Sequence, residues 1–88
     1  MTGAEDYVGR CRAAVIEWSE RLPAEAAGWA MHLIDHDEPA EGMCSLAWAI
    51  HEVGLLLDQG EIVKILDLIG DLIPADSLPP SFRGIGTA

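Results

Sequence analysis

Basic residues are scarce in this chain. Its 88 residues include 15 acids and only five bases, which gives a net charge of −10, and no Lys or Arg occurs between Arg21 and Lys64. A folded surface of one negative sign repels nucleic acids and anionic membranes, because their phosphates carry the same charge. The composition therefore argues against a nucleic-acid or membrane partner and favours a protein partner with a basic surface.

Long hydrophobic runs are also missing. No stretch of about 18 uncharged apolar residues is present to form a transmembrane helix. The first six residues show neither the basic region nor the apolar run of a secretory signal peptide. Cys11 and Cys44 are the only cysteines, and without a secretory signal two cysteines are more typical of buried thiols than of a disulfide. We expect a cytoplasmic protein.

Apolar residues recur at helical spacing in the first half of the chain. Spacings of three and four place one stripe on residues 4–22, which predicts the first helix. Pro23 suits the first position of a second helix, which is expected to run to about His36, because Pro39 disfavours helix at the residue before it. The two stripes are Val8, Cys11, Val15, Trp18 and Leu22, then Ala26, Trp29, Ala30, Leu33 and Ile34.

The third predicted helix begins near Pro39 and is apolar on two sides, which is typical of a central helix. Gly60 is predicted to cap its C-terminal end. A fourth helix is expected from Ile62 to Ile73, and Pro74 ends it. The main apolar face of the third helix consists of Met43, Leu46, Ala47, Ile50, Val53, Gly54 and Leu57.

These elements predict a single all-α domain. Four helices with short links and no strand alternation imply a compact antiparallel bundle over residues 1–73. Residues 74–88 form a proline-rich tail that is expected to be irregular. We expect Phe82 and Ile85 to hold part of this tail against the bundle.

The three tryptophans fall on three different predicted helices. Trp18 and Trp29 lie on the apolar stripes and are expected to anchor the core. Trp48 lies off the main stripe of its helix, and an exposed tryptophan is a frequent contributor to protein interfaces. Trp48 is therefore a candidate apolar anchor for a partner.

No motif in the sequence carries a strong catalytic signal. His32 and His36 are four residues apart, a spacing that can place two metal ligands on one helix face. Asp35, Asp37 or His51 could supply a third ligand, but histidine pairs of this kind are common by chance and no Cys-x-x-Cys accompanies them. His51-Glu52 lacks the second histidine of the zinc-protease helix. Ser77 lies in an Asp-Ser-Leu triplet like that of acyl carrier proteins, but prolines follow it where a helix should begin. We predict no catalytic residue, no metal site, no cofactor and no enzymatic activity.

Carboxylates are concentrated in the base-free stretch. One interpretation of the cluster at residues 35–41 is a solvated loop that keeps a small protein in solution. The other is a recognition edge that steers a cationic partner. Both interpretations stay open on these residues alone. The eight carboxylates of the stretch are Glu25, Asp35, Asp37, Glu38, Glu41, Glu52, Asp58 and Glu61.

The segment from Trp29 to Leu57 supports the second interpretation through a resemblance. The turn Leu33-Ile34-Asp35-His36-Asp37-Glu38-Pro39 and the following Leu46-Ala47-Trp48-Ala49-Ile50 resemble small acidic all-α immunity proteins of bacterial polymorphic-toxin systems. The similarity covers about residues 22–73. It implies a protein that binds and neutralises a toxin.

In that interpretation seven residues form the partner-binding surface. Four carboxylates at the turn supply the charge, two more extend the field, and one tryptophan is the apolar anchor. They are Asp35, Asp37, Glu38 and Glu41, then Glu52 and Asp58, then Trp48. The alternative is a small helical adaptor or regulatory module that acts by homodimerisation or apolar contact. A metal-dependent sensor that uses His32 and His36 is a third interpretation.

Overall fold

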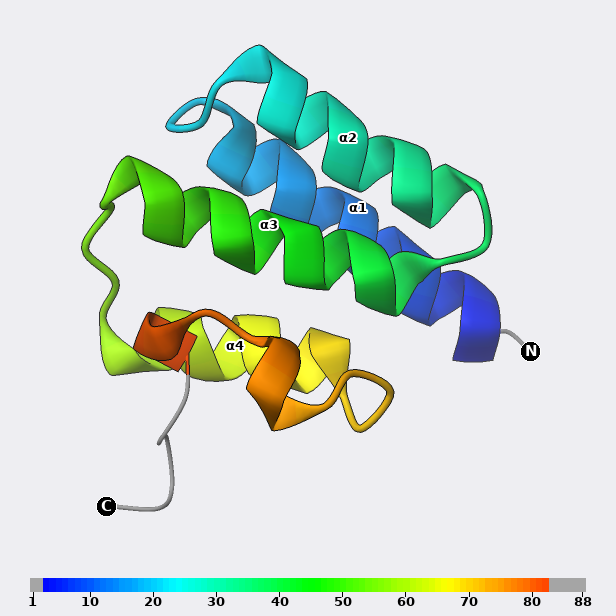
Figure 1. The fold of residues 1–88 in the computed structure, drawn as a ribbon. Helices are drawn as coiled ribbons and strands as arrows, with labels where there is room; N and C mark the ends of the chain where they lie inside the picture. Colours follow the sequence, from blue (N-terminus) through cyan, green and yellow to red (C-terminus); the bar gives the residue numbers. More distant parts are fainter. Residues whose placement is uncertain (1–2, 83–88) are drawn as a thin grey trace.

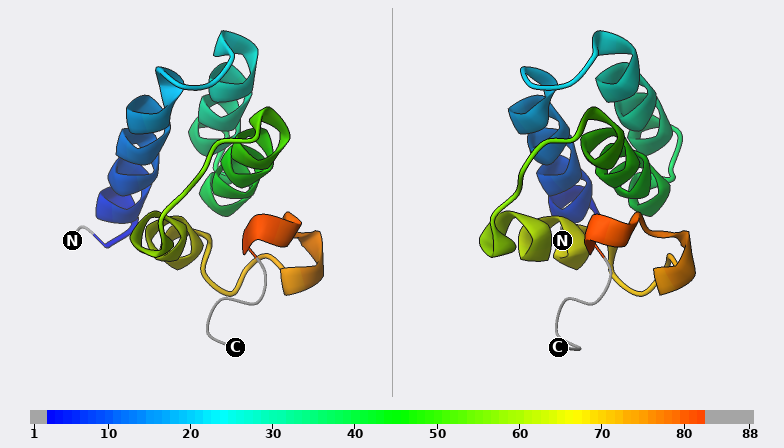
Figure 2. Two further views of the ribbon diagram at one scale, coloured as in Figure 1. Left: turned by 90° about the vertical axis from the view of Figure 1, so that its left-hand side faces the viewer. Right: turned by 60° about the vertical axis from the view of Figure 1, so that its left-hand side comes forward.

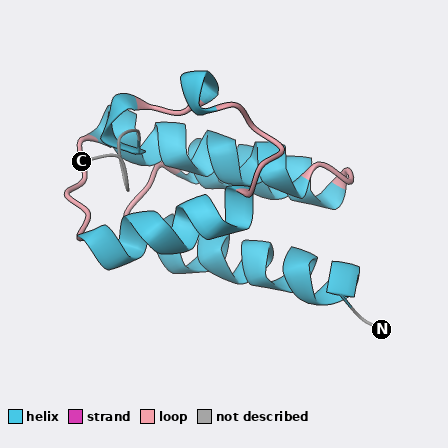
Figure 3. Ribbon diagram, turned by 90° about the horizontal axis from the view of Figure 1, so that it is seen from below, coloured by secondary structure: helices cyan, strands magenta, loops and turns pink. Residues whose placement is uncertain are grey.

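The computed structural model describes residues 3–82, which form four α-helices and two short 3-10 turns (Figure 1). Each helix runs opposite to the one before it (Figure 1), and no strand occurs in this range (Figure 3). The predicted all-α antiparallel bundle is confirmed. The elements are α1 (Gly3–Ser19), α2 (Ala24–Asp35), α3 (Pro39–Val53), α4 (Gln59–Ile69), η1 (Ala75–Ser77) and η2 (Pro80–Phe82).

Helix α3 is the centre of the bundle, as its two apolar faces predicted. It packs against α1, α2, α4 and η2, and α4 lies on the side of the bundle away from α2 (Figures 1 and 2). Burying apolar surface on both sides of one helix joins the elements into a single core. The α3 residues that are fully or almost fully buried are Met43, Leu46, Ala47 and Ile50.

Small residues let α2 approach α3 closely. A Cβ atom on Gly42 would lie 2.7 Å from the carbonyl oxygen of Ala30 and 2.7 Å from a side-chain carbon of Ile34. Ala27 and Ala30 are buried beside this contact. The α2–α3 hairpin is therefore held by close backbone packing, which resists deformation.

The predicted end of α3 at Gly60 is wrong. Gly54 ends the helix in a left-handed conformation at φ +83°, and the amides of Gly54 and Leu55 both bond the carbonyl of Ile50. Gly60 instead lies in the first turn of α4. The apolar spacing predicts Gly54 on the buried face of this helix, but a residue without a Cβ adopts a positive φ at low cost, so Gly54 ends the helix instead.

Helix α4 begins at Gln59 with a capping box, whose N-cap residue Asp58 lies four residues after Gly54. The Asp58 carboxylate accepts a hydrogen bond from the Glu61 amide at 2.8 Å, and the Glu61 carboxylate accepts one from the Asp58 amide at 3.1 Å. This box satisfies two amides that the helix leaves unpaired. The helix ends at Ile69, before Gly70 at φ +66°, and not at Ile73 as predicted.

The chain after Pro74 folds back onto the bundle as the two 3-10 turns. Leu78 and Phe82 belong to the hydrophobic core, and Phe82 is 1% exposed. The Trp48 indole N–H donates a hydrogen bond to the Ser77 carbonyl at 2.7 Å, which ties the turns to α3. The predicted anchoring by Phe82 is confirmed, and Ile85 lies outside the described residues.

Candidate functional site

The acidic cluster occupies the tight connection between α2 and α3. Asp35 ends α2, Asp37 and Glu38 form the turn, and Glu41 lies in the first turn of α3. The Glu38 amide bonds the carbonyl of Leu33 at 2.9 Å. Asp37 takes a left-handed conformation at φ +71°, which aspartate tolerates better than most residues. The turn therefore has a defined shape held by backbone hydrogen bonds.

One base reaches the cluster from a distant part of the chain. Arg12 on α1 donates hydrogen bonds to a single Asp35 carboxylate oxygen, over 3.1 Å from Nε and 2.7 Å from Nη2. The folded chain therefore brings a base, Arg12, to a stretch that contains no Lys or Arg of its own. Asp35, predicted to supply charge to a partner, already has its charge balanced within the fold.

The other three carboxylates of the cluster have no basic partner within residues 3–82. Within residues 3–82, Asp37, Glu38 and Glu41 take part in no ion pair, and all three are exposed. We call this set the acidic turn. Three like charges on one short connection create a local negative potential that is not compensated by neighbouring bases in the described structure.

An apolar patch borders the acidic turn. A hollow of about 210 Å³ lies between the turn and the chain after α4, where Leu72 and Ile73 line it. Leu72 is 75% exposed, although it is a large hydrophobic residue. The acidic turn therefore combines charge with an apolar contact, the two components of a typical protein interface.

The remaining predicted residues lie elsewhere. Glu52 is eleven residues beyond Glu41 on α3, which places it about 16 Å away along the helix axis at 1.5 Å per residue. The Asp58 carboxylate caps α4. Trp48 is half buried, and its N–H is bonded to the tail. Of the seven predicted residues, the four carboxylates of residues 35–41 therefore lie together, whereas Glu52, Asp58 and Trp48 lie apart from them.

The exposed face of α2 carries an aromatic row, in which Trp29 extends the predicted pair of His32 and His36. Trp29 was predicted to be a core residue, but it is 55% exposed. It stacks on His32 with ring centroids 5.3 Å apart, and His32 lies 4.0 Å from His36. The close α2–α3 approach excludes a large side chain, so Trp29 lies outside it. Trp18, in contrast, is buried as predicted, at 3% exposure.

The two histidines share a face, as their spacing predicted, but no third ligand joins them in the described range. Among residues 3–82, no group of three or more His, Cys, Asp or Glu side chains is placed to hold a metal ion. The two cysteines are free and buried. Burial raises the pKa of both the Cys11 and the Cys44 thiols, which opposes thiolate formation at neutral pH.

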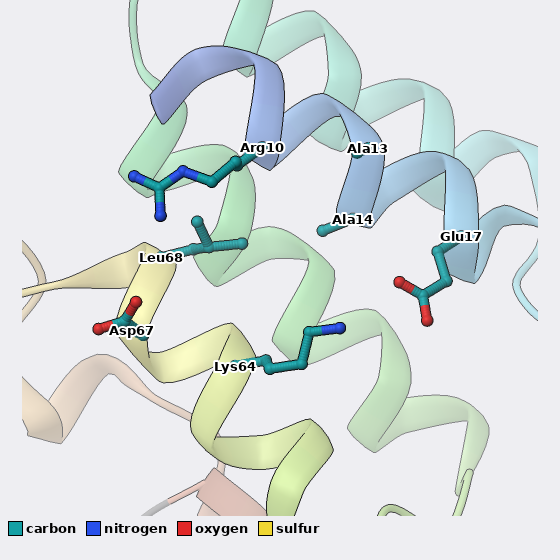
Figure 4. A pocket seen from close by; sticks show the side chains of 7 residues that line it. All are labelled: Arg10, Ala13, Ala14, Glu17, Lys64, Asp67 and Leu68. Carbon is teal, nitrogen blue, oxygen red and sulfur yellow. The ribbon is translucent and has the colours of Figure 1, made fainter. Parts of the chain in front are cut away.

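One feature absent from the sequence interpretation is a groove between α1 and α4. It encloses about 360 Å³ and has four charged side chains around an apolar floor (Figure 4). The signal in the sequence is the pair of small residues on α1, which face a helix of larger side chains. The lining residues are Arg10, Ala13, Ala14, Glu17, Lys64, Asp67 and Leu68.

Comparison with known proteins yields no relative. The chain matches no family model, no curated protein and no solved structure. None of the helices within residues 3–82 has the length and apolar character needed to cross a bilayer.

Proposed function

We propose that the chain is an immunity or inhibitor protein that binds a basic surface of a toxin through the acidic turn. The observation that carries the proposal is the position of Asp37, Glu38 and Glu41, unpaired within the described structure, beside the exposed Leu72. The carboxylates attract a cationic surface, and the leucine supplies an apolar contact once the two proteins meet.

The rigidity of the α2–α3 hairpin favours recognition. Gly42 lets the two helices pack at backbone distance, so the acidic turn is held in one conformation before a partner arrives. A binding surface that is ordered in advance loses less conformational entropy on association than a flexible loop does. The charge is then available for steering, which raises association rates 10- to 10³-fold in favourable cases.

The identity of the partner as a toxin rests on the resemblance of residues 29–57 to immunity proteins. Its basic character rests on the charge of the acidic turn. A nuclease toxin domain fits both, because a phosphate-binding cleft is basic and an acidic protein can occupy it.

Capture followed by growth rescue tests this proposal. The wild-type chain and the Asp37→Lys, Glu38→Lys, Glu41→Lys variant are immobilised and exposed to a cell lysate. A protein that is retained by the wild type and not by the variant is then expressed alone. The proposal expects that protein to arrest growth and co-expression of the wild-type chain to restore it. A captured protein that is harmless when expressed alone would exclude the immunity role, and equal rescue by the variant would exclude the acidic turn.

A further inference from the structure

The groove between α1 and α4 is a gap built into the packing of the two helices. At one end the Tyr7 hydroxyl donates a hydrogen bond to the Leu68 carbonyl. At the other end Arg21 approaches Glu61 to 3.8 Å. Between these two ties α1 offers only Ala13 and Ala14 to the groove floor, and their methyl groups are too small to fill the space. The result is the hollow of about 360 Å³.

Charges of alternating sign surround this hollow. Arg10 and Asp67 lie at one end, on opposite sides of the groove, and Glu17 and Lys64 lie at the other end (Figure 4). Neither cross-groove pair is close enough to be an ion pair in the described structure. Arg10 also lies 3.3 Å from Asp6 on its own helix, but both side chains are more than half exposed, at 56% and 70%, so this single contact is weak and can be exchanged for one with a partner. All four groove charges are exposed, so they are available to a second surface.

The groove surface differs in charge from the rest of the molecule. Its two bases and two acids sum to zero, whereas the chain carries −10. Two of the four bases in residues 3–82 line this one hollow. A partner of uniform charge gains nothing from such a surface, because attraction to two corners is offset by repulsion from the other two. The surface fits a partner whose charges also alternate.

We propose that the occupant of this surface is a second copy of the chain. In a two-fold dimer the same patch meets itself, with the axis lying in the interface. If the axis runs along the groove, Arg10 of one copy meets Asp67 of the other, and Lys64 meets Glu17. If the axis runs across the groove, Arg10 meets Glu17 and Lys64 meets Asp67. Every contact among these four groove charges is between unlike charges in either arrangement, and the apolar floors face each other.

The alternating pattern also makes a symmetric dimer compatible with the large net charge. Repulsion between two chains of −10 acts at long range and is screened over about 8–10 Å at physiological ionic strength. The paired charges at the interface are in direct contact and are screened less. The expected dimer is weak, with a Kd in the micromolar to millimolar range typical of small interfaces.

Two complementary double variants test the dimer. Glu17→Lys with Asp67→Lys makes all four groove charges positive and changes the net charge to −6, whereas Arg10→Glu with Lys64→Glu makes them all negative and gives −14. Sedimentation velocity is expected to show wild-type dimers, a rise of at least tenfold in Kd for each variant alone, and heterodimers in a mixture of the two. Both variants remain net negative, so overall charge cannot cause their association.

The matched control is Glu20→Lys with Glu25→Lys, which also gives −6 but changes exposed acids outside the groove. It is expected to dimerise at least as well as the wild type. A wild type that stays monomeric to about 1 mM, the weak end of this range, would overturn the proposal. So would a mixture of the two double variants that fails to associate, provided that circular dichroism shows both to be helical. The acidic turn is not part of the groove, so these outcomes are independent of the proposed toxin binding.

Discussion

Arg12 on α1 and Asp35 at the end of α2 form an ion pair that joins the two helices through two hydrogen bonds, the shorter of them 2.7 Å long. The pair removes one carboxylate from a cluster of four and leaves the acidic turn as the charged surface. Both side chains are about half exposed, at 49% and 48%. The stabilisation expected from such a pair is therefore small, in the range of about 0.2–1 kcal/mol.

The first prediction concerns this ion pair. Arg12→Gln and Asp35→Asn are each expected to lower the free energy of unfolding by less than about 1 kcal/mol, since solvent screens the pair. Urea unfolding of both single variants and of the double variant gives the coupling energy between the two side chains. A coupling well above about 1 kcal/mol would show that the pair is a major determinant of the fold.

The second prediction concerns the α2–α3 contact. Gly42→Ala is expected to destabilise the protein by about 1–3 kcal/mol, because the new methyl group would overlap the Ala30 carbonyl. Gly28→Ala is the matched control: it lies within α2 with open space around it, and helix propensity predicts a gain of about 0.5–1 kcal/mol. Thermal unfolding of the two variants should shift in opposite directions. Equal shifts would contradict the close packing of the hairpin.

The third prediction separates two roles of Asp58. Asp58→Ala removes the cap of α4 and should cost about 1 kcal/mol, whereas Asp58→Asn keeps an effective capping group and should cost much less. Denaturant unfolding distinguishes these cases. If the two variants lose the same stability, the carboxylate charge matters more than the capping hydrogen bond.

The fourth prediction is a pH dependence that arises from Tyr7. Burial, together with the neighbouring Cys11, raises the pKa of Tyr7 from 10.0 to about 12. Below pH 10 the phenol is protonated in both states. Between about pH 10 and 12 the unfolded chain releases its proton while the folded chain retains it, so the free energy of unfolding falls as pH rises.

Tyr7→Phe provides the comparison for this pH dependence. At pH 8 the variant should be less stable by about 1 kcal/mol, because the hydrogen bond to the Leu68 carbonyl is lost. Above pH 10 the difference should shrink, since only the wild type has the tyrosine contribution to lose. If the difference in free energy of unfolding between the wild type and Tyr7→Phe stays constant from pH 8 to pH 11, the raised pKa of Tyr7 is contradicted.

Helix number and the central position of α3 could be predicted from the sequence, because apolar spacing reports which helix faces are buried. Helix ends were less predictable. Gly54 and Gly60 are both plausible C-terminal caps, and the choice depends on Asp58 and Glu61, which form a capping box only if a new helix starts there. The choice of Gly54 as the end of α3 therefore depends on recognising the start of α4 at the same time.

The composition of the site depended on tertiary contacts. Arg12 and Asp35 are 23 residues apart, so a scan along the chain could not show that the base-free stretch receives a base. Trp29 and Ala30 are adjacent on α2, and which of them faces α3 depends on the space that Gly42 leaves. Sequence spacing located the acidic turn, and three-dimensional packing determined which of its charges remain unpaired in the described structure.

The most direct test of the acidic turn measures the association rate with the captured partner at several ionic strengths. Asp37→Asn, Glu38→Gln, Glu41→Gln removes three charges from the turn. Glu20→Gln, Glu25→Gln, Glu52→Gln removes three exposed charges that lie away from it. At low salt the turn variant should associate at least about tenfold more slowly than the wild type and show a weaker salt dependence, while the control should stay close to the wild type. Equal rates and equal salt dependence for the two variants would contradict binding through the acidic turn.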